Sequence, residues 1–337
     1  MERRAFGRLI AGAVASSAIL PFGRSAARAD DAKVARIAIQ FGYAYIPVLV
    51  ADKLGLFAKH AAVRGIGDTA FQITRVSGAN TINDGLISGS FDVGAYGLPG
   101  LLIAADKTRG NFDIRGLAAL VAGDNGLFVN RDDIKTLADF KPEDRIAVTG
   151  TTGQQGILLR MAAEKALGDA RRLDTNMVQL PHPDATASLI TSQTIAGYAA
   201  PHPYSDIVSR SPKVHKLFDF STYLGSSVTS GLLATTGKFV ARNPNIVGAI
   251  VAALREAGDA IKADPQRAAE IYGQSERSPL ETTDLVAMLR GVEAEWGVQP
   301  KGLMSVARFM AGAKLIKSAP AKWQDVFFSP VADGEGS

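Results

Sequence analysis

The sequence has 337 residues, of which 47% are hydrophobic and 21% charged, a composition typical of a packed globular protein long enough for two domains. Five of its 37 lysines and arginines and one of its 33 acidic residues lie in the first 29 positions, which leaves 32 basic against 32 acidic side chains. This balance excludes a strongly basic surface for nucleic acid or for an anionic membrane. The absence of cysteine excludes disulfide bonds and a cysteine-linked lipid anchor.

Residues 1–29 have the pattern of a secretory signal peptide. A basic start is followed by an apolar run, Leu9–Phe22, and by Ala27-Arg28-Ala29, which fits a cleavage site before Asp30. The apolar run is too short to span a bilayer. Arg3 and Arg4 are similar to a twin-arginine export signal, and the general secretory route stays open beside it. We therefore expect a soluble protein of the bacterial periplasm.

Beyond the signal peptide, short apolar runs alternate with stretches of helical periodicity. Strands are expected at 34–41, 70–76, 91–97, 144–150, 175–181 and 194–201, and helices at 45–60 with a break near Gly55, 80–90, 98–107, 154–167 and 204–210. This alternation predicts an α/β protein with a mostly parallel sheet in each domain, and the C-terminal third reads as helical.

The order of these segments predicts two lobes, one inserted into the other. Residues 30–128 plus 232–337 are expected to form lobe 1, and 129–231 to form lobe 2. Two chain crossings, near 124–130 and 229–236, would then make a two-strand hinge. The cleft between two hinged lobes is the natural place for a ligand.

The stretch "GTTGQQG", residues 150–156, follows an expected strand and opens an expected helix. Its glycines allow backbone N–H groups to approach a ligand, and a helix N-terminus favours negative charge. No Gly-Lys-Ser/Thr follows, so it is not a phosphate-binding P-loop. It is either a ligand loop or a plain strand-to-helix turn.

Two further loops occupy equivalent places after the first two strands. "FGYAY" (41–45) offers Tyr43 and Tyr45 for stacking or hydrogen bonding, and "SGAN" (77–80) opens a helix. Arg75, beside the second loop, could balance an anionic ligand or could be paired locally.

Pro-His-Pro occurs twice, around His182 and around His202. A zinc site would need three or four ligands, and neither the spacing nor an HExxH motif supports one. A Ser-His-Asp catalytic triad is also not supported, because the sequence has no GxSxG motif around a nucleophilic serine. Two rigid loops facing a ligand, or two structural turns, are the readings that remain.

The order of these motifs resembles that of the periplasmic binding proteins of ABC importers in the nitrate/sulfonate/taurine family. The segments that carry the resemblance are "IAIQFGYAYIPVLVADKLGLFAKH", "TINDGLISGSFDVGAYGLPGLLIA", "IKTLADFKPEDRIAVTGTTGQQGILLRMAAEKALG" and "ASLITSQTIAGYAAPHPYSD". Phe140, Pro142, Gln193 and Gly197 depart from the family's usual residues. The resemblance covers roughly residues 34–275.

This resemblance implies a two-lobed type II periplasmic binding protein that closes on a solute without catalysis. It also implies an ABC permease and its ATPase as partners, a monomer, and neither a cofactor nor a metal. The ligand loops would be Gln40–Tyr45, Ser77–Asn80, Thr149–Gln154 and Pro201–Tyr204. The residues expected to contact ligand are Gln40, Gly42, Tyr43, Tyr45, Ser77, Gly78, Asn80, Thr149, Thr151, Thr152, Gln154, His182, Pro201, His202 and Tyr204.

The class of ligand is left open by the sequence. The hydroxyl-rich loops and helix N-termini favour a small polar or anionic organic solute such as a sulfonate or taurine. The tyrosines favour a flat ring, such as a pyrimidine or an aromatic acid. An enzyme similar to the thiamin-pyrimidine synthases is a third possibility, although their cysteine-rich motif is missing here. A sensory binding protein that feeds a membrane receptor is a fourth.

Overall fold

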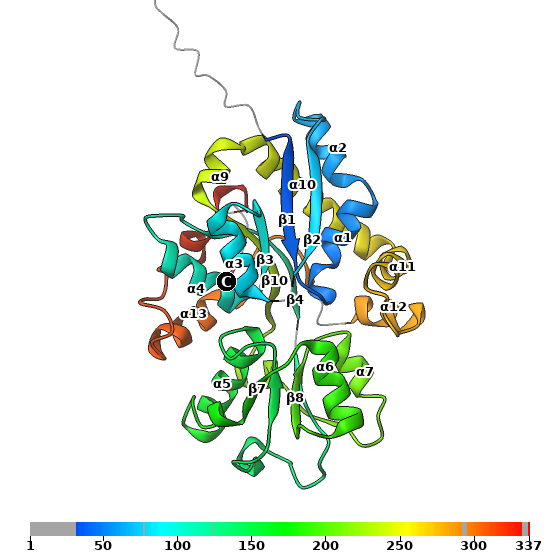
Figure 1. The fold of residues 1–337 in the computed structure, drawn as a ribbon, viewed down its shortest axis with the longest axis vertical. Helices are drawn as coiled ribbons and strands as arrows, with labels where there is room; N and C mark the ends of the chain where they lie inside the picture. Colours follow the sequence, from blue (N-terminus) through cyan, green and yellow to red (C-terminus); the bar gives the residue numbers. More distant parts are fainter. Residues whose placement is uncertain (1–31, 77, 124, 292–294, 332–335) are drawn as a thin grey trace, which may run out of the picture.

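The computed structural model describes residues 32–337 except 77, 124, 292–294 and 332–335, and the expected signal peptide lies outside them. Two lobes follow one another along the long axis of the molecule (Figure 1). Among the described residues, the sheet of lobe 1 has six strands, in the order β11 (Glu295–Trp296), β4 (Arg115–Gly123), β10 (Val228–Thr235), β3 (Val93–Tyr96), β1 (Val34–Ile39) and β2 (Ala70–Arg75). The sheet of lobe 2 has five, in the order β7 (Met177–Gln179), β6 (Ile146–Val148), β8 (Gly197–Ala200), β5 (Gly126–Val129) and β9 (His215–Asp219).

The α/β class and the two-lobed architecture are confirmed, but the sheets are mixed rather than mostly parallel. Strand β1 runs parallel to β2 and β3, and β6 runs parallel to β7 and β8. By contrast, β10 is antiparallel to both β3 and β4, and β5 is antiparallel to both β8 and β9. The antiparallel strands flank the points where the chain passes between the lobes, because a chain that leaves one sheet and later returns must reverse its direction.

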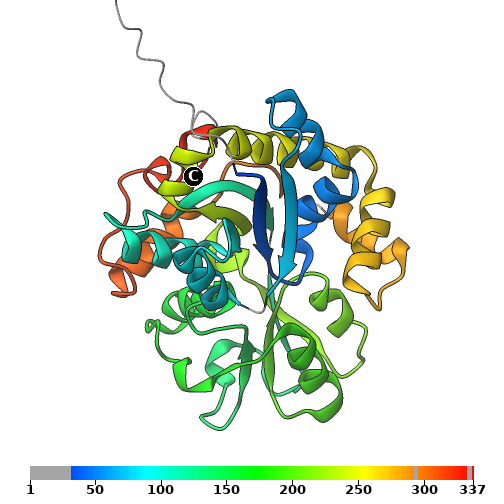
Figure 2. The ribbon, with the colours of Figure 1, turned by 45° about the horizontal axis from the view of Figure 1, so that its top comes forward.

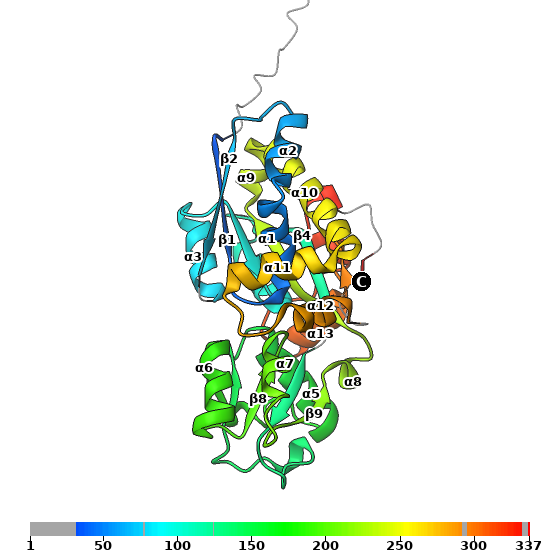
Figure 3. The same ribbon diagram turned by 90° about the vertical axis from the view of Figure 1, so that its right-hand side faces the viewer.

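Helices lie on both faces of the first sheet (Figure 3). In lobe 1 the helical segments are η1 (Tyr43–Tyr45), α1 (Ile46–Lys53), α2 (Leu56–Val63), α3 (Ala79–Ser88), α4 (Leu98–Thr108), α9 (Gly237–Arg242), α10 (Pro244–Ala263), α11 (Pro265–Glu276), α12 (Thr282–Arg290), α13 (Leu303–Gly312), η5 (Trp323–Val326) and η6 (Ser329–Val331). In lobe 2 they are η2 (Leu137–Asp139), α5 (Gln154–Leu167), η3 (Asp174–Asn176), α6 (His182–Ala187), a π-helical turn η4 (Ser188–Ser192), α7 (Tyr204–Val208) and α8 (Ser221–Leu224). No helix within the described ranges combines the length and the apolar character needed to cross a bilayer.

The chain passes from lobe 1 to lobe 2 between the end of β4 at Gly123 and the start of β5 at Gly126, and it returns between α8 and β10. Strand β4 belongs to the first sheet and β5, only two residues later, to the second. On return, β10 lies wholly in the first sheet, between β3 and β4. All eight residues of β10 are buried, so the returning strand is a central element of lobe 1.

Each lobe has apolar residues packed around its sheet. One large cluster includes Ile37, Leu101 and Leu232 of lobe 1 and extends to Leu158 of lobe 2. A second, smaller cluster surrounds Tyr198 on β8 and lies entirely in lobe 2. The two Pro-His-Pro loops therefore lie next to a small core of their own.

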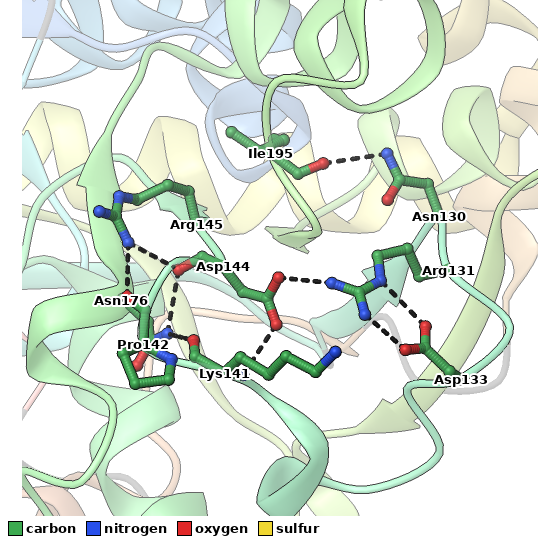
Figure 4. A network of polar contacts seen from close by, with 9 residues as sticks. All are labelled: Asn130, Arg131, Asp133, Lys141, Pro142, Asp144, Arg145, Asn176 and Ile195. Atoms are coloured by element: carbon green, nitrogen blue, oxygen red, sulfur yellow. Dashed lines mark hydrogen bonds and ion pairs between the residues drawn. The ribbon is translucent and has the colours of Figure 1, made fainter.

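A polar network in lobe 2 surrounds the turn that precedes β6 (Figure 4). The buried carboxylate of Asp144 accepts from Arg131 Nη1 at 2.6 Å and from the Lys141 backbone N–H at 2.8 Å. Asn176 Nδ2 donates to the backbone oxygens of Lys141, at 2.6 Å, and of Asp144, at 2.9 Å. These bonds fix the turn that leads into β6, and β6 in turn carries the glycine-rich loop to the lobe boundary.

Candidate functional site

Tyr43 lies where the two lobes meet. Its hydroxyl is 3.3 Å from Ser230 Oγ on β10, and its ring is only 2% exposed. The ring meets the imidazole of His202 edge-on at 5.6 Å between centroids, and the indole of Trp296 at 6.3 Å. His202 belongs to lobe 2 and the other three to lobe 1, so this cluster joins the lobes.

The other residues of the first expected ligand loop have structural contacts. Gln40 Nε2 donates to the backbone oxygen of Ala95 at 3.0 Å and so ties the ends of β1 and β3 together. Tyr45 is buried in the core of lobe 1, and this burial raises the pKa of its hydroxyl well above the ordinary value. Gly42 is buried beside them, at the start of η1. Of this loop, Tyr43 is the residue that the structure brings to lobe 2.

The second expected loop is described in part. Ser77 lies outside the described residues, Gly78 precedes α3, and Asn80 is exposed in the first turn of that helix. Arg75, just before this loop, is paired with the carboxylate of Glu276 on α11 at 2.9 Å. It also donates to the backbone oxygen of Ser275 at 2.5 Å, and its guanidinium lies 5.8 Å from the Phe41 ring centroid. Of the two readings of Arg75, the structure therefore gives local pairing.

The glycine-rich loop sends its two glutamines to different places. Gln154 is buried at the lobe boundary, where its side chain bonds to Leu98 and Thr229 of lobe 1. Gln155 turns back into lobe 2, accepting from Thr149 Oγ1 at 2.9 Å and donating to Asn125 Oδ1 at 3.4 Å. Thr151 and Thr152 are exposed at the tip of the loop.

Gly156 explains part of the glycine content of this loop. A β-carbon at this position would lie 2.5 Å from the Gly150 backbone oxygen and 2.6 Å from that of Thr151. Neither backbone atom can move without breaking the turn. This glycine is therefore required for the close approach of the loop to the first turn of α5, independently of any ligand.

The two Pro-His-Pro loops lie against each other in lobe 2. The His182 ring stacks on the Tyr204 ring at 4.9 Å, and its Nδ1 is 2.6 Å from the Tyr198 hydroxyl. Burial lowers the pKa of His182 to about 3, so this imidazole is neutral at physiological pH. His182 is thus held among tyrosines in the wall of lobe 2.

His202 has a different environment. Its Nδ1 is 2.5 Å from Asp206 Oδ2 and 3.1 Å from Ser205 Oγ. A cavity of about 130 Å³ adjoins this pair and extends to Lys216 and Asp219. Because Asp206 holds Nδ1, the other ring nitrogen of His202 is the one available for a further hydrogen bond. Pro201, before His202, is buried.

No group of three or more histidine, aspartate or glutamate side chains able to hold a metal ion occurs in the part of the chain that the structure describes. His182 and His202 each use Nδ1 on a neighbouring side chain of the same lobe. Ser205 and Asp206 both approach the same nitrogen of His202, so they do not form the relay of a nucleophilic serine, which needs both ring nitrogens.

Three residues of this site could not be found from the sequence. Ser230 lies in an apolar strand, Trp296 is one of two tryptophans far along the chain, and Glu276 closes a polar helix. Each reaches the site from a position about 190 to 250 residues away from its partner. Single-sequence patterns carry no signal for such long-range pairings.

A family model described as the NMT1-like family matches residues 29–273, which is most of the chain. The chain belongs to the NMT1-like family. No significant match to this NMT1-like chain is found among curated proteins.

Solved structures show the same fold at low sequence identity. The aliphatic sulphonate binding protein SsuA from Escherichia coli aligns with a TM-score of 0.68 at 17% identity, over 89% of this chain and 94% of that one. The alkanesulfonate-binding protein SsuA from Xanthomonas axonopodis pv. citri, bound to MOPS, aligns with a TM-score of 0.70 at 18% identity, over 88% of this chain and 99% of that one. The nitrate-binding protein NrtA from Synechocystis aligns with a TM-score of 0.62 at 16% identity, over 78% of this chain and 73% of that one. The expected resemblance and the periplasmic binding protein fold are thereby confirmed.

Proposed function

We propose that this chain is the solute-binding component of an ABC importer. In this proposal it is exported to the periplasm, captures a small solute between its lobes, and delivers the solute to a membrane permease driven by an ATPase. Its family, its fold and the binding functions named for its structural neighbours support this role. The observation that carries it is the meeting of Tyr43 of lobe 1 with His202 of lobe 2, because a ligand that contacts both favours the closed state.

We assign the hinge to the two segments that join the lobes, one between β4 and β5 and the other between α8 and β10. The proposed ligand contacts are Tyr43, Ser230, Trp296 and His202, in the cleft that opens when these segments bend. Tyr204 and His182 form the wall behind His202. The ligand class favoured by the hydroxyls and by His202 is a small polar or anionic organic solute, in line with the sulfonates and nitrate named for the neighbours.

A second ligand class is supported by one specific observation. Tyr43, Trp296 and His202 form a cluster of edge-on rings, an arrangement that also suits a flat aromatic or heteroaromatic ligand. An aromatic acid would use both the rings and the hydrogen-bonding groups.

The test is thermal unfolding of the chain without residues 1–29 in the presence of taurine, alkanesulfonates, nitrate, pyrimidines and aromatic acids. A solute at ~100 times its dissociation constant should stabilise the protein by ~2.7 kcal/mol, which raises the midpoint by several degrees. A shift confined to one chemical class names the ligand. Chemical conversion of the stabilising solute by the pure protein would overturn a binding role without catalysis.

A further inference from the structure

The Gln154 side chain joins the two lobes through both ends of its amide. It is the first residue of α5 in lobe 2 and is 7% exposed. Its Oε1 accepts from the Leu98 backbone N–H at 3.1 Å, and its Nε2 donates to the Thr229 backbone oxygen at 3.3 Å. Both partners belong to lobe 1, Leu98 at the start of α4 and Thr229 on the returning strand β10.

Helix α4 has no cap from its own sequence. The residue that precedes it is Gly97, which has no side chain to accept from the free N–H groups of the first turn. Leu98 is fully buried, so its N–H needs an acceptor from elsewhere. Gln154 of the other lobe supplies that acceptor, and separating the lobes removes it.

Gly97 also makes room for this contact. A β-carbon on Gly97 would lie 3.1 Å from Gln154 Oε1 and 3.2 Å from Gln154 Cβ, which is tighter than an ordinary contact. The φ of Gly97 is −78°, so alanine fits the backbone itself. An added methyl group would therefore disturb the Gln154 contact from the lobe 1 side without straining the chain.

Apart from the apolar cluster that extends from lobe 1 to Leu158, two further contacts between the lobes are of weaker kinds. Arg210, after α7, pairs with Asp284 on α12, and both side chains are exposed, so water and salt screen the pair. Tyr43 meets His202 through ring edges rather than through a hydrogen bond. The Gln154 amide, by contrast, is buried and bonds to two buried backbone groups of lobe 1.

We propose that Gln154 is a latch that holds the lobes together in the protein without ligand, rather than a ligand contact. Because the latch would regulate the cleft in which the solute binds, this inference rests on the proposed solute-binding function. The latch sets the fraction of protein that is closed before ligand arrives. Because apparent affinity scales with the fraction of molecules in the binding-competent state, a tenfold fall in that fraction weakens apparent affinity about tenfold.

The test compares Gln154→Ala, Gly97→Ala and their double variant with Asn130→Ala. Asn130 is the matched control because it is also an amide with two side-chain hydrogen bonds, which it donates to the backbone oxygens of Leu189 and Ile195 within lobe 2. The readouts, both without ligand, are the radius of gyration from small-angle X-ray scattering and hydrogen exchange at the Leu98 amide. Circular dichroism confirms that each variant is folded.

We expect a larger radius of gyration and faster Leu98 exchange in Gln154→Ala and in Gly97→Ala, with no further change in the double variant. Asn130→Ala should lower the melting temperature and leave both readouts unchanged. An unchanged radius of gyration with a still-protected Leu98 amide in Gln154→Ala overturns the latch. The latch is also contradicted if Gly97→Ala opens the lobes and Gln154→Ala does not.

These readouts need no ligand, so the latch and the proposed function fail separately. If a solute from the panel binds and Gln154→Ala stays closed, the latch is wrong and the binding function stands. If Gln154→Ala opens and no solute class binds, the latch stands and the ligand assignment fails.

Discussion

Tyr43 and His202 meet edge-on across the lobe boundary with 5.6 Å between their ring centroids. One residue follows the first strand of the chain, and the other follows a strand of the inserted lobe. Neither ring can keep this contact when the lobes separate. The pair therefore reports whether the lobes are together, and it places an aromatic edge and an imidazole nitrogen side by side at the proposed ligand site.

Tyr43 can be tested with two substitutions that separate its hydroxyl from its ring. Tyr43→Phe loses the contact with Ser230 Oγ and should cost about 1 kcal/mol in the free energy of unfolding. Tyr43→Ala removes a buried ring and should cost about 3–5 kcal/mol. Urea unfolding measures both. Affinity for the solute found in the panel should fall by about tenfold or more in Tyr43→Ala, equivalent to ~1.4 kcal/mol. Unchanged affinity would remove Tyr43 from the binding site.

His182 should make stability depend on pH. Its pKa is about 3 in the folded protein and near 6.5 in the unfolded chain. Between these values the unfolded chain takes up a proton that the folded protein refuses, so stability falls as the pH falls, by ~1.4 kcal/mol per pH unit at most. His182→Gln removes this titration. The difference in unfolding free energy between the two proteins should change below pH 6.5 and stay constant above it.

Parallel pH curves for the wild type and His182→Gln would show that His182 is accessible to solvent. Every other titrating group is the same in both proteins, so their contributions cancel in the difference.

Gly156→Ala tests the close approach in the glycine-rich loop. The new methyl group would overlap two backbone oxygens, and we expect a loss of about 1–3 kcal/mol in thermal or urea unfolding. Gly312→Ala is the matched control, since Gly312 is also helical and a β-carbon there meets no atom within 4 Å. That variant should be neutral or slightly stabilised. Equal effects at the two positions would contradict the steric role of Gly156.

Asp144 should matter for stability and not for ligand affinity. It is buried and accepts from Arg131 and from the Lys141 backbone, so Asp144→Ala leaves buried donors unpaired and should cost about 2–4 kcal/mol. Asp133→Ala removes the exposed partner of the same arginine and should change the urea midpoint little. A larger loss of stability in Asp133→Ala than in Asp144→Ala would contradict the stabilising role assigned to Asp144.

The fold was largely predictable because its signals are local. Helix α5 spans Gln154–Leu167 as the sequence predicts, between Gly153 and Gly168, and the buried strands follow apolar runs. The helix expected at 45–60 is divided into α1 and α2 near Gly55. The expectation of a mostly parallel sheet in each lobe was wrong, because β5 and β10 run antiparallel to their neighbours and an apolar run carries no information on strand direction.

The site was predictable only as a set of loops. The sequence indicates that residues near Tyr43, Gln154 and His202 follow strands, and the structure places all three at the lobe boundary. The sequence does not indicate the direction in which each side chain points. Gln154 faces lobe 1 while Gln155 faces lobe 2, a difference of about 100° around one helix.

The pairing of Val228 with Gly123 has a consequence for synthesis of the chain. The chain leaves lobe 1 and returns to it at neighbouring residues of two adjacent strands, and lobe 2 is formed by the continuous segment between them. Strand β10 lies between β3 and β4, so the first sheet lacks a middle strand until residue 235 has left the ribosome. The inserted lobe can therefore fold first, while the earlier lobe waits with exposed strand edges. A chain in this state has exposed strand edges that need protection from aggregation until residue 235 has been made.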